Sequence, residues 1–239
     1  LGDIVACGPV ARELKRRNPR SFVVWLCRAA FGELARAIPN VDAVVAVDTL
    51  DQVADLAPAL ARWQAIDLTL RGKKFADGVR GWTKTSGDPC INTENYLHYG
   101  SLLTALCRGA GFTVADEHPA LNLPPSAGSE ADALALPQSF IALHCAADEG
   151  ARNWSAENWR ALIAELLASG HHVVELGQKP TGLSPSHPAY HDLAGRTSQL
   201  GAAEVLRRAT LFVGIESGPG HLANAVGTPA VILQGRYRV

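Results

Sequence analysis

The sequence predicts an α/β protein built from two lobes with parallel sheets. Short apolar runs of strand length alternate with amphipathic stretches of helix length over most of the 239 residues. Such alternation is typical of parallel strands covered by helices. A stretch rich in proline, alanine and acidic residues interrupts the pattern, which then starts again. We therefore expect an N-terminal lobe over 1–122, a linker over 123–138 and a C-terminal lobe over 139–239.

The N-terminal lobe is expected to start with a helix, because apolar residues in 4–17 recur at helical spacing and the segment ends in basic residues. "SFVVWLC" is a continuous apolar run, as expected of a strand buried on both faces. Pro39 stops the second helix, and glycine ends the last one. The expected order is helix 4–17, strand 21–27, helix 29–38, strand 41–48, helix 51–64, strand 65–70, a polar loop over 73–95 and helix 94–111.

The C-terminal lobe is expected to repeat this construction, with Ser155 as the N-cap of its first helix and Gly170 at that helix's end. The expected order is strand 139–146, helix 155–170, strand 171–177, helix 200–209, strand 210–215, helix 221–227 and strand 229–235. Ligands of such folds bind at the carboxyl ends of the strands, and between lobes where there are two. We therefore expect the site in an interdomain cleft.

Composition limits the classes of function. Hydrophobic residues make up 47% and charged residues 19%, which fits a globular protein with a core. The net charge of −1 provides no overall field that would attract nucleic acid. No apolar run is long enough to cross a bilayer, and nothing resembles a secretory signal. The five cysteines are scattered and lack CxxC spacing, which favours free thiols in a reducing compartment over a zinc site or disulfides.

Methionine is absent, even from position 1. The first residues, "LGDIVACGPV", read as the end of a strand entering a helix, and the chain stops abruptly at "GRYRV". We therefore expect the written sequence to be a fragment, or to lack residues, with the first strand of the N-terminal lobe and the C-terminal end of the second lobe missing.

Two short segments carry side chains suited to chemistry. Asp3 stands at the start of the first helix, where the plainer interpretation is an N-cap. The functional alternative is a carboxylate that takes a proton from a substrate hydroxyl. Arg152 stands in the loop between a strand and a helix, where it is suited to hold a phosphate with the help of the helix N-terminus. The plainer interpretation is a solvated surface arginine.

The segment "ESGPGH", residues 216–221, lies between a strand and a helix N-terminus. Small residues allow a ligand to approach the backbone, and the helix start supplies N–H groups and a positive dipole end suited to phosphate. Glu216 and Ser217 can hydrogen-bond hydroxyl groups, and His221 can face the same site. The alternative is a glycine-rich connection in which Ser217 is only a cap.

Three blocks in order resemble the heptosyltransferases and their relatives, glycosyltransferase family 9. The opening "LGDIVACGPVARELKRRNPRSFVVWLCRAAFGELARAIPNVDAVVAVD" is similar to the family's first segment. "ARNWSAENWRAL" is similar to its basic-x-Trp-x-x-x-x-Trp segment. "GIESGPGHLANAVGTPAVILQG" looks like its Asp-Ser/Thr-Gly-x-x-His block.

The resemblance implies a GT-B fold, with two Rossmann-like lobes and the donor held mainly by the second. It implies an inverting, metal-independent transfer of a sugar from a nucleotide-diphosphate donor, typically ADP-heptose, to a lipopolysaccharide core or related glycan acceptor. No cofactor or metal is expected. The implied general base is Asp3, and the implied donor-binding residues are Arg152, Glu216, Ser217, Gly218, Gly220 and His221. Glu216 stands where the family usually has Asp, and Arg152 where it usually has Lys.

We expect acceptor contacts from the polar loop, with Lys73, Lys74 and Asn95 as candidates. The expected location is cytoplasmic, with peripheral contact at the inner membrane where basic clusters such as 15–20 could meet anionic lipid. Nucleic acid is not an expected partner. Two other functions stay open: a sugar-nucleotide epimerase or hydrolase on the same fold, and a non-catalytic module that binds a sugar nucleotide or glycan.

Overall fold

The computed structural model describes residues 1–72, 87–146 and 152–235. Lys73 and Lys74, two of the expected acceptor-side residues, lie outside this range. The chain divides into two compact units, one formed mainly by Asp3–Pro119 and the other mainly by Ala120–Arg238. We call them the N-terminal and the C-terminal unit. Within the described residues, no helix is both long enough and apolar enough to cross a bilayer.

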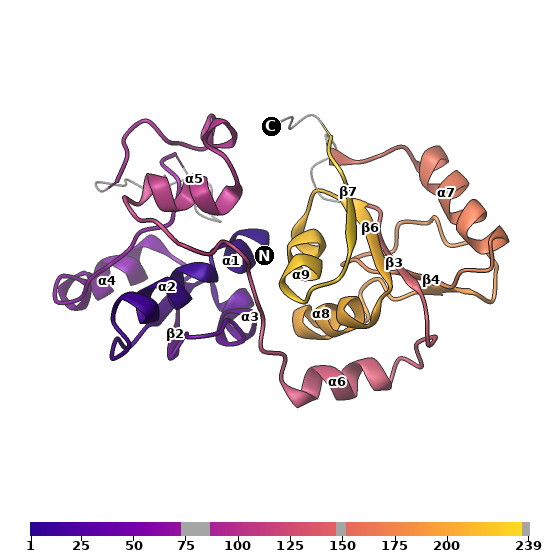
Figure 1. Cartoon of the computed structure of the whole chain (residues 1–239), viewed down its shortest axis with the longest axis horizontal. Coiled ribbons are helices and arrows are strands. Elements are labelled where there is room, and N and C mark those ends of the chain that lie inside the picture. The colour runs from indigo at the N-terminus through magenta and orange to yellow at the C-terminus, as the bar shows by residue number, and fades with distance from the viewer. Residues whose placement is uncertain (73–86, 147–151, 236–239) are drawn as a thin grey trace. The chain divides into compact units, whose positions relative to one another are not determined.

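The N-terminal unit contains a parallel pair of strands, in register from Val24 opposite Ala43 to Cys27 opposite Ala46. Helices precede, connect and follow this pair (Figure 1). Its elements are α1 (Gly2–Ala6), α2 (Pro9–Arg17), β1 (Val24–Cys27), the 3-10 helix η1 (Ala29–Phe31), α3 (Gly32–Arg36), β2 (Ala43–Ala46), α4 (Leu50–Leu60), the 3-10 helix η2 (Tyr96–Tyr99) and α5 (Leu102–Gly109).

Four expected elements of this unit differ in the structure. The single helix expected over 29–38 is the 3-10 helix η1 followed by the short α3. The single helix expected over 4–17 is two helices, because Pro9 starts α2 and has no N–H to continue the turn before it. The strand expected over 65–70 does not form: these residues pair with no neighbouring strand, and next to them Arg71 makes an isolated bridge to Asn92. The helix expected over 94–111 is interrupted at Gly100, whose φ of 102° lies outside the helical region.

Helix α5 begins immediately after that interruption. The Ser101 hydroxyl accepts the Thr104 backbone N–H at 3.1 Å and so satisfies one of the unpaired donors of the first turn. Leu103 and Cys107 on this helix pack with Val10 of α2 and with Phe112. The core of the N-terminal unit therefore joins segments from both ends of its sequence.

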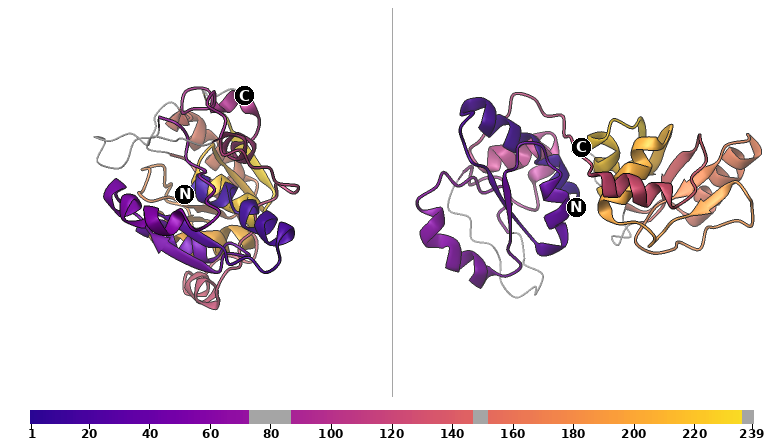
Figure 2. Two further views of the ribbon diagram at one scale, coloured as in Figure 1. Left: turned by 90° about the vertical axis from the view of Figure 1, so that its left-hand side faces the viewer. Right: turned by 90° about the horizontal axis from the view of Figure 1, so that it is seen from below.

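The C-terminal unit is built around a parallel sheet (Figures 1 and 2). This sheet has five strands in the order β5-β4-β3-β6-β7. This order places the first strand of the unit in the middle, as in doubly wound dinucleotide-binding folds. Its elements are α6 (Pro125–Asp132), β3 (Ile141–His144), α7 (Ala156–Ala168), β4 (Val173–Glu175), β5 (Tyr190–Asp192), α8 (Gln199–Arg208), β6 (Leu211–Ile215), α9 (Gly218–Ala225) and β7 (Ala230–Leu233).

Helices cover both faces of this sheet (Figure 1). On one face, Trp159 and Ile163 of α7 are buried with alternate strand residues such as Leu143, Val213 and Ile215. On the other face α8 and α9 pack together, and α9 contacts β6 and β7. Full coverage explains why the central strands read as continuous apolar runs in the sequence.

The segment expected as a linker, 123–138, contains a helix that packs on the C-terminal unit. Glu130 of α6 accepts hydrogen bonds from the backbone N–H and the hydroxyl of Ser198, both at 2.6 Å. Asp132 forms an ion pair with Arg208 of α8 at 2.7 Å. The low apolar content of α6 hid this helix from sequence analysis, because its contacts to α8 include these polar groups.

Helices α2 and α8 each contain a buried glutamate that pairs with two arginines of the same helix. Glu13 is 4% exposed and accepts hydrogen bonds from Arg16 and Arg17. Glu204 is 2% exposed and accepts hydrogen bonds from the arginines three and four residues on. The hydrogen bonds from Arg16 and then Arg17 lower the pKa of Glu13 to about 2. Each helix thus ends in two arginines, which also favour the C-terminal end of the helix dipole.

Candidate functional site

Two connections at the carboxyl edge of the five-stranded sheet bring Arg152 and Glu216 together. Arg152 lies between β3 and α7, and Glu216 directly follows β6, the neighbour of β3 in the sheet. Arg152 Nη1 lies 3.3 Å from Glu216 Oε2, and the two side chains are 28% and 41% exposed. Residues 64 positions apart in the sequence (216 minus 152) therefore form one ion pair at the edge where ligands of such folds bind.

Ser217 is the N-cap residue of α9 by position, but its side chain does not cap the helix. Its hydroxyl is buried and donates to the Ile215 carbonyl at 3.0 Å. From the sequence we expected Ser217 to cap the helix or to contact a ligand. In the structure its hydroxyl instead bonds to the last residue of β6. A hydroxyl that donates can still accept, so Ser217 keeps one capacity toward a ligand.

Gly218 and Gly220 start helix α9, and His221 follows in the same first turn. The small size of Gly220 matters for packing, because a Cβ there would lie 3.1 Å from the Ile232 Cδ1 of β7. Neither glycine has a positive φ. Close approach of α9 to the sheet is therefore one reason for glycine in this turn, beside the ligand approach expected from the sequence. His221 is partly exposed.

Asp3 lies in the first turn of α1, with its side chain exposed. The N-cap of α1 is Leu1, so the plainer interpretation of Asp3 as the cap is wrong. The carboxylate still stands at the positive end of this short helix, where an acidic side chain is favourable. Asp3 belongs to the N-terminal unit, whereas Arg152 and Glu216 belong to the C-terminal unit.

Asn95, the third expected acceptor-side residue, is engaged within its own loop. Its Nδ2 donates to the Cys90 carbonyl at 2.8 Å, and its Oδ1 accepts the Asn92 backbone N–H at 3.0 Å. Both ends of the amide therefore hold the loop around 90–95 together. Contact with an acceptor would have to use the capacity that these two bonds leave.

The basic cluster over 15–20, expected as a contact for anionic lipid, is partly paired within the protein. Lys15 pairs with Asp42 at 2.6 Å, and Arg16 and Arg17 both pair with Glu13. These contacts favour the plainer interpretation of a charged helix end.

Glu175, the last residue of β4, is a buried polar group that was not expected from the sequence. Glu175 is fully buried and accepts hydrogen bonds from the hydroxyl of Thr181, at 2.5 Å, and from that of Tyr190. Burial, followed by the hydrogen bond to Glu175, raises the pKa of Tyr190 above its ordinary value. Glu175 was read only as part of the apolar run "HHVVELG", and a lone acid in such a run was the available signal.

A second buried group lies at the end of the central strand. His144 of β3 is buried, and its Nδ1 contacts the Leu176 carbonyl at 2.9 Å. Burial lowers the pKa of His144, which favours the neutral ring. His144 thus contacts the backbone just after β4, and Glu175, the last residue of β4, bonds to Thr181 and Tyr190.

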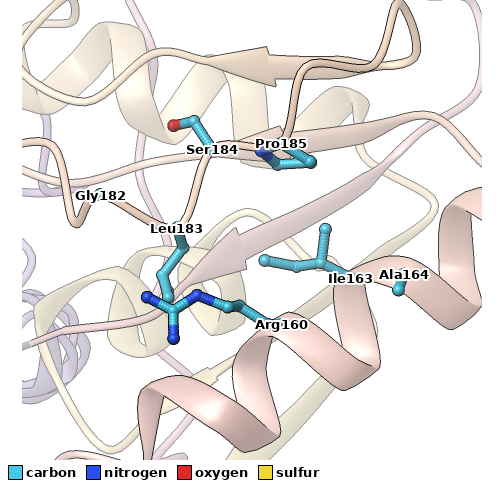
Figure 3. A pocket seen from close by; sticks show the side chains of 7 residues that line it. All are labelled: Arg160, Ile163, Ala164, Gly182, Leu183, Ser184 and Pro185. Atoms are coloured by element: carbon cyan, nitrogen blue, oxygen red, sulfur yellow. The ribbon is translucent and has the colours of Figure 1, made fainter.

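A pocket of about 310 Å³ lies between α7 and the connection from β4 to β5 (Figure 3). Arg160, Ile163 and Ala164 reach it from the helix, and the segment 182–185 closes its other side. It contains none of the site residues expected from the sequence. Elsewhere in the described residues, no group of three or more His, Cys, Asp or Glu side chains is arranged to hold a metal ion.

Comparison with known proteins identifies the family. The sequence model of glycosyltransferase family 9 (heptosyltransferase) matches residues 98–238, which is more than half of the chain. Lipopolysaccharide heptosyltransferase 3 of Escherichia coli strain K12 is 31% identical over 121 residues, which cover 44% of this chain and 33% of that protein. The aligned part therefore spans only a third of the curated relative.

Solved structures share the fold. A glycosyl transferase of family 9 from Veillonella parvula superposes with a TM-score of 0.70 at 16% identity, covering 99% of this chain and 79% of that one. The E. coli heptosyltransferase WaaC, solved with ADP, superposes with a TM-score of 0.61 at 16% identity, covering 97% and 83%. The α/β fold with parallel sheets is therefore of the GT-B type, as expected from the sequence.

Proposed function

The chain belongs to glycosyltransferase family 9, and from this premise we propose that it transfers a sugar from a nucleotide-diphosphate donor to a glycan acceptor, with inversion and without a metal. Heptose, ADP-heptose and a lipopolysaccharide core or related glycan are the first candidates for sugar, donor and acceptor. The observation that carries the proposal is the Arg152–Glu216 pair, which stands beside the N-terminus of α9 at the carboxyl edge of the sheet.

The proposed donor site uses the charges of that edge. The leaving diphosphate gains negative charge as the bond to the sugar breaks, and in the absence of a metal this charge needs cations and helix N-termini. Arg152 supplies a guanidinium that can grip two phosphate oxygens at once. The turn over Ser217, Gly218, Gly220 and His221 supplies the helix start. Glu216 is assigned to hydroxyl groups of the donor.

Asp3 is the proposed general base, by its match to the family's position. The acceptor hydroxyl attacks the anomeric carbon on the side opposite the diphosphate. As the new carbon–oxygen bond forms, the bond to the diphosphate oxygen breaks, and the hydroxyl proton passes to the Asp3 carboxylate. One displacement inverts the anomeric centre. The exposed side chain of Asp3 gives an incoming hydroxyl access to the carboxylate.

We place the protein in the cytoplasm, with peripheral contact at the inner membrane made through a lipid-linked acceptor. This contact does not require the basic cluster over 15–20, in which Lys15, Arg16 and Arg17 pair with carboxylates of the protein. Vesicles with and without the acceptor glycolipid test this part: binding should require the acceptor, and equal binding to plain anionic vesicles would contradict it.

Two measurements test the function. Calorimetric titration with ADP, UDP, GDP and ADP-heptose should show selective binding of the adenine compounds, and preference for another nucleotide would keep the family and reject ADP-heptose. Asp3→Asn should then lower kcat for transfer by about 10²- to 10⁴-fold with an unchanged donor Kd, because a positioned base contributes rate and not donor binding.

Asp55→Asn is the matched control, because Asp55 is an exposed aspartate on α4 of the same unit. It should leave kcat unchanged. Near wild-type transfer by Asp3→Asn would remove Asp3 from catalysis. Release of free sugar without an acceptor would instead indicate a hydrolase, and binding without any turnover would indicate a non-catalytic module.

A further inference from the structure

Arg152 and Glu216 are assigned to different parts of the donor, yet in the structure they bind each other. The guanidinium that would grip the diphosphate lies 3.3 Å from the carboxylate that would read a sugar hydroxyl. The carboxylate and the diphosphate are both anionic, so they compete for the charge of the one guanidinium. The two assignments are therefore coupled.

The Glu216 carboxylate also belongs to the residue before the N-terminus of α9, the second feature of the site that suits an anion. Glu216 directly precedes the N-cap of α9, and the side chain of that N-cap residue, Ser217, does not cap the helix. An acidic group close to a helix N-terminus is stabilised by the dipole. Glu216 thus places one negative charge beside both features that suit a phosphate, the guanidinium and the helix start.

The contact is weak enough for a ligand to break. With 28% and 41% of the side chains exposed, water screens the pair, and such a pair changes an equilibrium by at most about fivefold. A diphosphate carries more charge than a carboxylate and offers an arginine two oxygens at a time. In competition for Arg152 the diphosphate should therefore displace Glu216.

We propose that Glu216 is an internal competitor of the donor diphosphate for Arg152. Donor binding moves Arg152 from Glu216 to the diphosphate, and this exchange releases the Glu216 carboxylate to accept a hydrogen bond from a hydroxyl of the donor. Binding of the diphosphate by Arg152 thus leaves the whole Glu216 carboxylate to the hydroxyl groups of the sugar. This inference rests on the proposed function, since it requires a diphosphate at this edge.

The direction in which Glu216→Gln changes the affinity for ADP distinguishes competition from a supporting role. If Glu216 competes, Glu216→Gln removes the competitor, and ADP binds about two- to fivefold more tightly. If Glu216 instead orients Arg152 for the phosphate, the same change weakens ADP binding. ADP-heptose should gain less than ADP, because the variant also loses a charged acceptor for a donor hydroxyl.

The experiment is calorimetric titration of the full-length protein with ADP and with ADP-heptose. Glu165→Gln is the charge-matched control, an exposed glutamate far along α7, and it should leave both affinities unchanged. The double variant Arg152→Ala/Glu216→Gln is compared with Arg152→Ala alone. The two should bind ADP with equal affinity, because no guanidinium remains for which Glu216 could compete. Circular dichroism checks that each variant is folded.

The outcomes distinguish failure of the proposed function from failure of the competition between Glu216 and the diphosphate. If wild type binds none of ADP, UDP and GDP, the proposed function fails. If wild type binds ADP but Glu216→Gln binds it equally or more weakly, the competition is overturned while the function stands. A gain that persists in the Arg152→Ala background also overturns it, because the effect would then be general repulsion and not competition for the arginine.

Discussion

Removal of the Tyr190 hydroxyl tests how the C-terminal unit keeps a carboxylate in its core. Glu175 is 0% exposed, and its two hydrogen-bond donors from side chains are Tyr190 and Thr181. Tyr190→Phe keeps the ring in its packing and leaves Oε2 of Glu175 without that donor. A hydrogen bond to a buried charged group contributes about 2 kcal/mol.

For a chain of 239 residues, this loss corresponds to a fall in Tm of about 4–8 °C. Differential scanning calorimetry and urea unfolding measure it. Tyr99→Phe is the matched control, because the ring of Tyr99 lies under Arg108 and keeps that contact without its hydroxyl. A loss of stability no greater than that of Tyr99→Phe would show that the Tyr190 hydroxyl does not stabilise buried Glu175.

Two further readouts bear on the same network. Adding Glu175→Gln to Tyr190→Phe should recover part of the stability, because an amide with one partner missing costs less to bury than a charge. Because the pKa of Tyr190 is raised in the folded state, its contribution is complete below pH ~10 and is lost as pH rises further, when only the unfolded chain ionises. Tyr190→Phe should therefore flatten the alkaline limb of the stability profile.

The remaining predictions concern charge and thiols. Because Arg16 and Arg17 lower the pKa of Glu13 to about 2, its contribution is present above pH ~4.3 and is lost as pH falls toward 2, so Glu13→Gln should flatten the acid limb measured by circular dichroism; an unchanged limb would contradict this. Of the five cysteines only Cys90 is exposed, so a thiol reagent should label one site quickly in the native protein and five in denaturant; two or more fast sites would count against the described packing.

Residue periodicity was sufficient for the strands and helices that are buried or amphipathic. The runs "SFIALHCA" and "TLFVGI" predicted the central strands β3 and β6, and the α/β class with parallel sheets is confirmed. The ordered blocks around Arg152 and 216–221 identified the family, which the comparisons confirm. The roles of individual site residues stay predictions.

Elements held by polar or isolated contacts escaped the sequence analysis. Helix α6 packs through Glu130 and Asp132, so its apolar content gave no signal. Strand β5 is only three residues long, Tyr190–Asp192, which is too short to show alternation. The expected strand over 65–70 had the right composition but forms no ladder, since strand formation depends on a partner that composition does not reveal.

The fold class, the family and the chemical types of the candidate site residues could be predicted from the sequence, because burial and helix starts leave local patterns along the chain. Which of those residues contact each other became clear only from the three-dimensional structure. The pairing of Arg152 with Glu216 and the burial of Glu175 against Tyr190 both depend on neighbouring parallel strands. Contacts of this kind follow from sheet order, and sheet order is set by the packing of the whole unit and not by any local stretch.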